Sequence, residues 1–310
     1  MRDILNFYMR KIIYNIIKYP LILIFIKTPF INILKRRFKN YQISKKRNII
    51  WFVLDTLFER EYFNKLNNKE EIREITNSRL IDGAGRKFAQ DYYNEHFQTL
   101  DELKKRRTGT MSQSDASPMF ERMINYIKSN NLSDDKNTYI IQLGSSSGRD
   151  LEFFLKIFPK LNYISTDVND EILDFQKEKY SYPNFKYFKC YAEDIDECIN
   201  HFKISEKNII LFSSSSLQYV NPFFLEEFFQ KIKNYKNLNL FISEPVSLLF
   251  IDYNKLISDN RGNISFSHRY DEYAKNSNLN IIVNQVIRPY STDDKQHGQT
   301  GHLDLQVSNF

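Results

Sequence analysis

Strand-like and helix-like runs alternate along the chain from Thr138 onward. The expected strands are apolar runs bounded by turn residues, at 138–143, 162–167, 185–190, 208–213 and 239–244. Helix-like runs separate or follow them at 150–158, 170–180, 195–202, 223–235 and 269–278, and two further strand-like runs come last, at 280–290 and 302–310. This alternation predicts an α/β fold with a parallel sheet covered on both faces, which binds ligands at the carboxyl ends of its strands.

The first of these strands leads into a turn with two spaced glycines, in the stretch TYIIQLGSSSGRD at 138–150. The chain has only eight glycines, and Gly144 and Gly148 both fall at this joint. We expect Gly144 to permit the tight turn and Gly148 to let the helix pack closely. The backbone N–H groups and the positive helix end at such a joint are available to a ligand. An ordinary tight turn in an α/β domain is the alternative.

The next expected strand ends in Asp167, 19 residues beyond Gly148. An acid at about this distance from a glycine turn accepts hydrogen bonds from ribose hydroxyls. The dinucleotide fingerprint G-x-G-x-x-G would require glycine where Ser146 and Arg149 stand, and no Gly-Lys-Ser/Thr of a P-loop follows. The pattern therefore favours an adenosine ligand without a pyrophosphate.

The turn resembles motif I of the class I S-adenosylmethionine-dependent methyltransferases, which is an acid, any residue, and then three glycines at alternate positions. Here those positions read Gln142, Gly144, Ser146 and Gly148, so glutamine replaces the acid and serine replaces the middle glycine. Serine and glutamine retain the ability to hydrogen-bond the methionine carboxylate or amine. A degenerate, non-catalytic domain is the alternative that these replacements leave open.

The resemblance continues in order along the chain, over about residues 118–310. CYAEDI at 190–195 is similar to the segment beside adenine, LFSSSSLQYV at 211–220 to the fourth strand and its loop, and FISEP at 241–245 to the fifth strand. Tyr191 stands where many relatives have an acid. The resemblance implies S-adenosylmethionine as cofactor and a doubly wound, mostly parallel seven-stranded sheet (a Rossmann-like methyltransferase fold) whose last strand is antiparallel. The cofactor-binding residues that it implies are Gln142, Gly144, Ser145, Ser146, Ser147, Gly148, Asp167, Val168, Ala192, Glu193, Ser213 and Ser214.

A hydroxyl acceptor would benefit from a general base with a pKa near neutrality. Of the five histidines, His268 follows the fifth expected strand and is the best placed, and Glu244, at the end of that strand, is the second candidate. A histidine at the start of a helix with no catalytic role is the alternative for His268.

The fourth strand lacks the Asn/Asp-Pro-Pro-Tyr sequence that methyltransferases acting on nitrogen often carry. SSSSLQY at 213–219 instead resembles small-molecule and sugar methyltransferases. We therefore predict O-methylation of a sugar or another small hydroxyl acceptor, and by analogy a lipid-linked or surface-polysaccharide sugar. The alternatives are an RNA methyltransferase and a non-catalytic, membrane-associated binding protein.

The basic charge of the chain is concentrated in its first residues. Residues 1–47 contain twelve of the 44 Lys and Arg residues and one of the 38 acids, so they carry +11, and the remaining 32 basic and 37 acidic residues carry −5. A mildly acidic catalytic region argues against a nucleic-acid substrate. In residues 1–48 the apolar runs are interrupted by Lys or Arg, by Pro20 and by Pro29, and none approaches the roughly 20 apolar residues of a spanning helix.

We predict that residues 1–48 are a basic amphipathic segment at an anionic membrane surface; helices packed on the domain are the alternative. Residues 49–131 are expected to form a helical cap or lid, and residues 132–310 the methyltransferase domain. Cys190 and Cys198 belong to no CxxC or Cys/His cluster, so no metal is expected. The predicted location is cytoplasmic, peripheral on the inner face of the membrane.

Overall fold

The computed structural model describes residues 117–248, 251, 256–260, 265–287 and 300–309, together with Glu70, Arg73, Ala89 and Gln90. The basic segment predicted at 1–48 and most of the cap predicted at 49–131 lie outside these residues. Within the described part of the chain, no helix combines the length and the apolar character needed to cross a bilayer.

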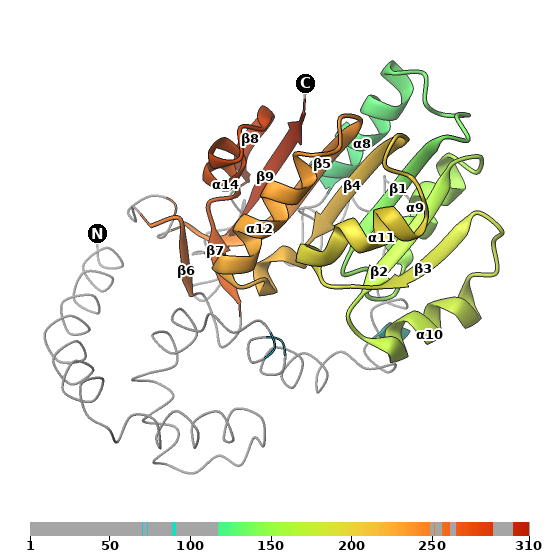
Figure 1. The fold of residues 1–310 in the computed structure, drawn as a ribbon, viewed down its shortest axis with the longest axis horizontal. Helices are drawn as coiled ribbons and strands as arrows, with labels where there is room; N and C mark the ends of the chain where they lie inside the picture. The colour runs from blue at the N-terminus through green and yellow to red at the C-terminus, as the bar shows by residue number, and fades with distance from the viewer. Residues whose placement is uncertain are drawn as a thin grey trace, which may run out of the picture.

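Seven strands form one twisted sheet in the order β3-β2-β1-β4-β5-β9-β8 (Figure 1). Their bounds are β1 Thr138–Leu143, β2 Asn162–Asp167, β3 Phe185–Lys189, β4 Asn208–Ser214, β5 Leu238–Ser247, β8 Asn280–Ile287 and β9 Thr300–Ser308. The first five strands pair in parallel, whereas β9 runs antiparallel to both β5 and β8. The doubly wound, mostly parallel seven-stranded sheet with an antiparallel last strand is therefore confirmed.

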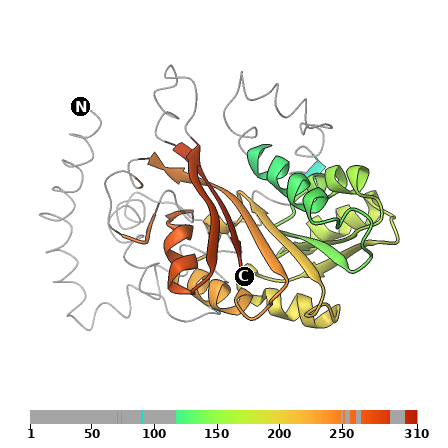
Figure 2. The ribbon, with the colours of Figure 1, turned by 90° about the horizontal axis from the view of Figure 1, so that it is seen from above.

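The strands are apolar along their length because both faces of the sheet are buried. In β1, Ile141 and Leu143 belong to the core on one face, whereas Ile140 belongs to the core on the other. Figure 2 shows the resulting three layers, with helices above and below the sheet. The first core includes residues of α11, α12 and α14, and the second includes residues of α8 and α9. The helix bounds are α8 Ser117–Ser129, α9 Arg149–Ile157, α10 Asp170–Lys179, α11 Ile195–His201, α12 Pro222–Ile232 and α14 Tyr270–Asn276.

Helix α8 packs into the core of the sheet domain, although it precedes the boundary expected at residue 132. The ring of Phe120 lies 5.3 Å from that of Phe154 and 6.1 Å from that of Phe212, between ring centroids. Met119, Met123 and Ile127 are fully buried in the same core. The packed unit therefore includes α8, which lies before the boundary expected at residue 132.

A small second sheet was not predicted from the sequence. It pairs β6 Ser258–Asn260 with β7 Phe266–His268 in antiparallel register. Strands of three residues are too short for an alternating pattern to be recognised. This sheet determines the surroundings of His268.

The strand order reverses between β1 and β4, which are neighbours in the sheet but are separated in the chain by β2 and β3. Chains leaving the carboxyl ends of β1 and β4 turn in opposite directions, which opens a crevice at this edge of the sheet. The loops after β1, β2, β3 and β4 meet there.

Candidate functional site

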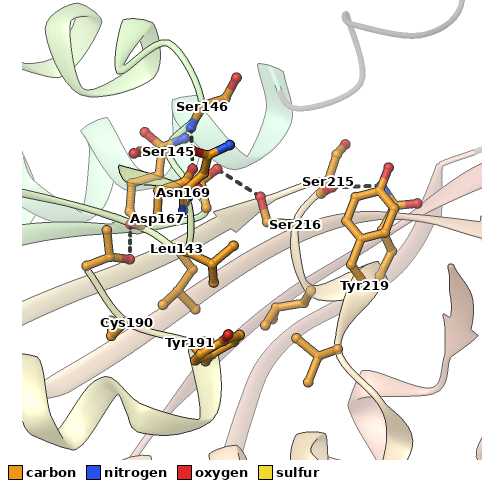
Figure 3. A pocket seen from close by; sticks show the side chains of 18 of the residues that line it. Leu143, Ser145, Ser146, Asp167, Asn169, Cys190, Tyr191, Ser215, Ser216 and Tyr219 are labelled. Atoms are coloured by element: carbon orange, nitrogen blue, oxygen red, sulfur yellow. Dashed lines mark hydrogen bonds between the residues drawn. The ribbon is translucent and has the colours of Figure 1, made fainter. Parts of the chain in front are cut away.

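A cavity of about 310 Å³ lies at this crevice, a volume at the lower end of the range for ligand pockets. Figure 3 shows Ser145, Ser146, Asp167 and Asn169 gathered on one side of it and Ser215 and Tyr219 on the other. The residues that line it are Arg73, Gln142, Leu143, Gly144, Ser145, Ser146, Asp150, Thr166, Asp167, Val168, Asn169, Ile172, Cys190, Tyr191, Ala192, Glu193, Ser214, Ser215, Ser216, Leu217, Gln218, Tyr219, Val220, Asn221 and Phe224.

Gly144 forms the turn after β1 and is required by a close contact with the loop after β4. Its φ of +60° is left-handed, and a Cβ here would lie 2.5 Å from Ser216 Oγ and 2.7 Å from Ser216 Cβ. The Ser216 hydroxyl donates to the Gly144 carbonyl at 3.0 Å. Gly148, with φ +74°, precedes α9, and a Cβ there would lie 2.7 Å from the Tyr180 ring. The two glycines thus allow two neighbouring segments to approach the turn.

Buried polar side chains of β2 and α10, together with Tyr180, hydrogen-bond the turn after β1. The Gln176 amide of α10 donates to Ser145 Oγ at 2.8 Å and to the Ser146 carbonyl at 2.7 Å. Ser165 Oγ of β2 lies 2.5 Å from Ser145 Oγ, and the Tyr180 hydroxyl donates to the Ser147 carbonyl at 2.9 Å. These hydrogen bonds keep the backbone of the turn in one conformation.

Asp167 ends β2 with its carboxylate at the cavity and only 7% of the residue exposed. The Ser146 N–H donates to Oδ2 and the Asn169 N–H to Oδ1, each at 3.1 Å. Burial raises the pKa of the carboxyl from 3.8 to about 6, against the lowering effect of these backbone donors and that of Val168. Ser146 has a φ of +51°, so serine adopts here a left-handed conformation that suits glycine better.

The segment after β3 forms another wall, and Arg73 covers it. The short helix η2 Ala192–Asp194 follows Tyr191, and both Ala192 and Glu193 line the cavity. The Arg73 guanidinium donates to Glu193 Oε1 at 3.1 Å and also to Asp194. Burial raises the pKa of Glu193, and the charge of Arg73 opposes this shift. Arg73 could not be predicted from the sequence, because a contact across 120 positions leaves no local pattern.

Glu244 of β5 is fully buried and holds the loop after β4. Its carboxylate accepts from the Ser213 hydroxyl at 2.6 Å and from the N–H groups of Ser216, Leu217 and Gln218 at 2.9, 3.0 and 3.1 Å. Burial raises the pKa of Glu244, while these four donors oppose the shift. Glu244 is absent from the described lining of the cavity. Glu244 therefore holds the loop after β4 in place, whereas the sequence analysis predicts it as the second candidate base.

His268, the first candidate base, is also fully buried and does not belong to the described lining. Its Nδ1 lies 2.7 Å from Ser258 Oγ, and its Nε2 lies 3.1 Å from the Val220 carbonyl. Ser258 Oγ is in turn 2.7 Å from the Tyr273 hydroxyl. Since Val220 lines the cavity, this hydrogen bond connects His268 to the site through the backbone of the loop after β4. The unpredicted pairing of β6 with β7 buries the histidine.

Most of the predicted cofactor-binding residues meet at the cavity. Gln142, Gly144, Ser145, Ser146, Asp167, Val168, Ala192, Glu193 and Ser214 line it, whereas Ser147, Gly148 and Ser213 are absent from the described lining. Asp150, Asn169 and Tyr219 also line the cavity but were not predicted as site residues. Two of them had a local signal, because Asp150 begins the helix expected after the glycine turn and Asn169 closely follows Asp167. Among the described residues, no group of His, Cys, Asp and Glu is arranged to hold a metal ion.

The strand order and the cavity at its switch point define a doubly wound α/β domain of Rossmann-like type. No family model matches the sequence, and no curated protein matches it. Solved structures that the chain is similar to include a SAM-dependent methyltransferase from Anabaena variabilis, at 13% identity over 72% of this chain and 92% of that one, with a TM-score of 0.45. Another is the geranyl diphosphate C-methyltransferase from Streptomyces coelicolor, at 12% identity over 73% and 98%, with a TM-score of 0.42.

Proposed function

We propose that the chain binds S-adenosylmethionine in this cavity and transfers its methyl group to a hydroxyl of a small or saccharide acceptor. The observation that carries the proposal is the Asp167 carboxylate, held at the end of β2 beside the Gly144 turn and facing the cavity. A carboxylate at this place accepts hydrogen bonds from the two ribose hydroxyls of an adenosine. Ala192 and Tyr191 would then lie along the adenine.

The charge of the lining supports a cationic ligand. The lining contains the acids Asp150, Asp167 and Glu193, and its described basic residue is Arg73, which is bonded to Glu193 and Asp194. A ligand with a sulfonium and an ammonium group is attracted to such a surplus of negative charge. The same surplus repels a polyanion, which argues against an RNA substrate.

The acceptor would occupy the side of the cavity formed by the loop after β4. The residues that line this side include the polar Ser215, Gln218, Tyr219 and Asn221 and the aromatic Phe224. Neutral donors and acceptors beside an aromatic ring are suited to a hydroxylated molecule such as a sugar. A lipid-linked or surface-polysaccharide sugar is the acceptor we propose, with residues 1–48 binding the inner face of the membrane through their +11 charge.

When bound, the cofactor supplies an already activated methyl group, so the protein has to orient the acceptor and exclude water. Neither His268 nor Glu244 belongs to the described lining, and both hold the loop that would contact the acceptor. We therefore assign them to positioning that loop, and assign the rate enhancement to proximity and orientation. The acceptor hydroxyl would release its proton to solvent water as its oxygen takes the methyl group and the cofactor leaves as the thioether.

The proposal is tested by methyl transfer from labelled S-adenosylmethionine to a cell-envelope saccharide fraction. The parent should transfer the label, and Asp167→Asn should bind the cofactor about 10–100-fold more weakly, since the lost hydrogen bonds to a charged group contribute ~1.5–3 kcal/mol. Asp174→Asn, which removes the same charge from an exposed position on α10, is the control. Equal affinity of parent and Asp167→Asn would refute the ribose assignment, and cofactor binding without transfer to any hydroxyl acceptor would favour a non-catalytic binding protein.

A further inference from the structure

Four consecutive serines span the end of β4 and the start of the loop after it, and their hydroxyls have two different environments. The first, Ser213, donates to the Glu244 carboxylate at 2.6 Å, and the fourth, Ser216, donates to the Gly144 carbonyl at 3.0 Å. The second and the third line the cavity, and their hydroxyls donate to no other described residue. Two hydroxyls therefore build the loop, and two face the space that a ligand would fill.

The third serine, Ser215, has a backbone conformation that suits glycine better. Its φ is +62°, in the left-handed region. Among the described residues other than glycine, Asn131, Lys203 and Asn278 also have positive φ, but each follows the end of a helix, where a left-handed residue is common. Ser146 and Ser215 instead line the cavity. A strained residue at a ligand cavity indicates that its side chain is needed there.

The backbone of Ser215 is held on both sides, so its hydroxyl has a fixed place. The Ser215 N–H donates to the Ser243 carbonyl at 3.0 Å, and Gln218 Nε2 donates to the Ser215 carbonyl at 2.7 Å. Figure 3 shows Ser215 on the same side of the cavity as Tyr219, opposite Asp167. This is the side assigned above to the acceptor. A polar group that is already fixed in place loses little freedom when it binds a ligand.

We propose that the Ser215 hydroxyl binds a hydroxyl group of the acceptor and favours hydroxylated molecules over apolar ones. A serine hydroxyl both donates and accepts hydrogen bonds, so it suits a hydroxyl partner in either orientation. Glycine would relieve the left-handed backbone but would remove this contact. The inference rests on the proposed function, because it assumes methyl transfer to a hydroxylated acceptor in this cavity.

Two substitutions separate the hydroxyl from the backbone. Ser215→Gly and Ser215→Ala both remove the hydroxyl, but only glycine relieves the left-handed conformation. With labelled S-adenosylmethionine and the cell-envelope saccharide fraction, both variants of the full chain should raise the apparent KM for the acceptor about 3–10-fold, as expected for one lost neutral hydrogen bond. Calorimetry should give an affinity for S-adenosylhomocysteine within about twofold of the parent. The Tm of Ser215→Gly should equal or exceed that of the parent.

Lys203→Gly is the matched control, because Lys203 is an exposed left-handed residue outside the described lining of the cavity. It should keep or raise the Tm and leave the KM for the acceptor unchanged. A KM like that of the parent in either Ser215 variant would overturn the inference. A fall in both Tm and affinity for S-adenosylhomocysteine in the two variants would also overturn it, because the hydroxyl would then hold the loop rather than the acceptor. No transfer of label by the parent would overturn the proposed function, and the inference with it.

Discussion

The guanidinium carbon of Arg73 lies 3.9 Å from the centre of the Tyr191 ring, and both residues line the cavity. The same guanidinium bonds Glu193, which is only 3% exposed. A cation over an aromatic face, fixed by two carboxylates, forms a planar cover on one wall of the cavity. Tyr191 thus provides the aromatic face on which Arg73 stacks.

Arg73→Ala should therefore destabilise the domain, because it leaves the buried Glu193 without its cation. Since the Arg73 side chain is 24% exposed, we expect a loss of about 1–3 kcal/mol in the free energy of unfolding rather than the larger cost of a fully buried pair. Arg73→Lys should restore only part of this, because lysine lacks the planar group. Urea denaturation measures the effect, and Lys177→Ala, which breaks an exposed pair, should cost under about 1 kcal/mol. A loss no larger in Arg73→Ala than in this control would show that the contact contributes nothing.

The raised pKa of Asp167 makes cofactor affinity depend on pH. With a folded-state pKa of about 6, the carboxylate is mostly protonated at pH 5 and mostly ionised at pH 7. An ionised carboxylate accepts stronger hydrogen bonds from hydroxyls, so S-adenosylhomocysteine should bind about tenfold more tightly at pH 7 than at pH 5. Calorimetry over this range in parent and Asp167→Asn provides the comparison. A pH dependence that persists unchanged in Asp167→Asn would assign it to another group.

The same shift predicts the sign of a stability effect without ligand. Because the folded-state pKa lies above the usual 3.8, the folded protein holds this proton more tightly than the unfolded chain does. The stabilising contribution of the Asp167 proton is complete below about pH 4 and is lost as the pH rises through 6. The loss is ~3 kcal/mol for a pKa raised from 3.8 to about 6. Denaturation of Asp167→Asn at pH 4 and pH 7, measured against the parent, should show the variant gaining relative stability at the higher pH.

The contact of Gly144 with Ser216 predicts coupling between two loops. Gly144→Ala forces a Cβ against Ser216 and into a left-handed backbone, so it should cost about 1–3 kcal/mol of stability and weaken cofactor binding. Ser216→Gly removes the obstructing atoms, so the double variant should be less destabilised than the sum of the single variants by about 1 kcal/mol. Additive effects in denaturation would mean that backbone strain alone makes glycine necessary.

His268 provides a direct comparison between a catalytic base and a positioning residue. A base contributes about 10²–10⁴-fold to the rate, whereas removing a hydrogen bond to the Val220 carbonyl should lower turnover by less than about tenfold. His268→Ala should also lower the Tm, and His268→Gln should restore most of both. Turnover measured as a function of pH is the decisive readout. If His268 were a general base, its substitution would remove one limb of the pH–rate profile.

The sequence predicted the sheet well because its signals are local. Continuous apolar runs predicted β1 to β5. Gly144 was expected to permit a tight turn, and it adopts a positive φ that glycine tolerates better than other residues. The burial of Glu244 and His268 could not be predicted, because it depends on how the loop after β4 folds back and on the short pair β6 and β7. Arg73 and the hydrogen bond from Gln142 to Asp150 depend on contacts between segments, which no periodicity records.

Binding of the cofactor by the unmodified chain is the central claim, and it is tested most directly by calorimetric titration with S-adenosylhomocysteine at pH 7. This test needs no knowledge of the acceptor. We expect one site per chain and a Kd of about 100 μM or tighter, near −5.5 kcal/mol. No heat of binding and no rise in Tm at millimolar ligand would contradict the account.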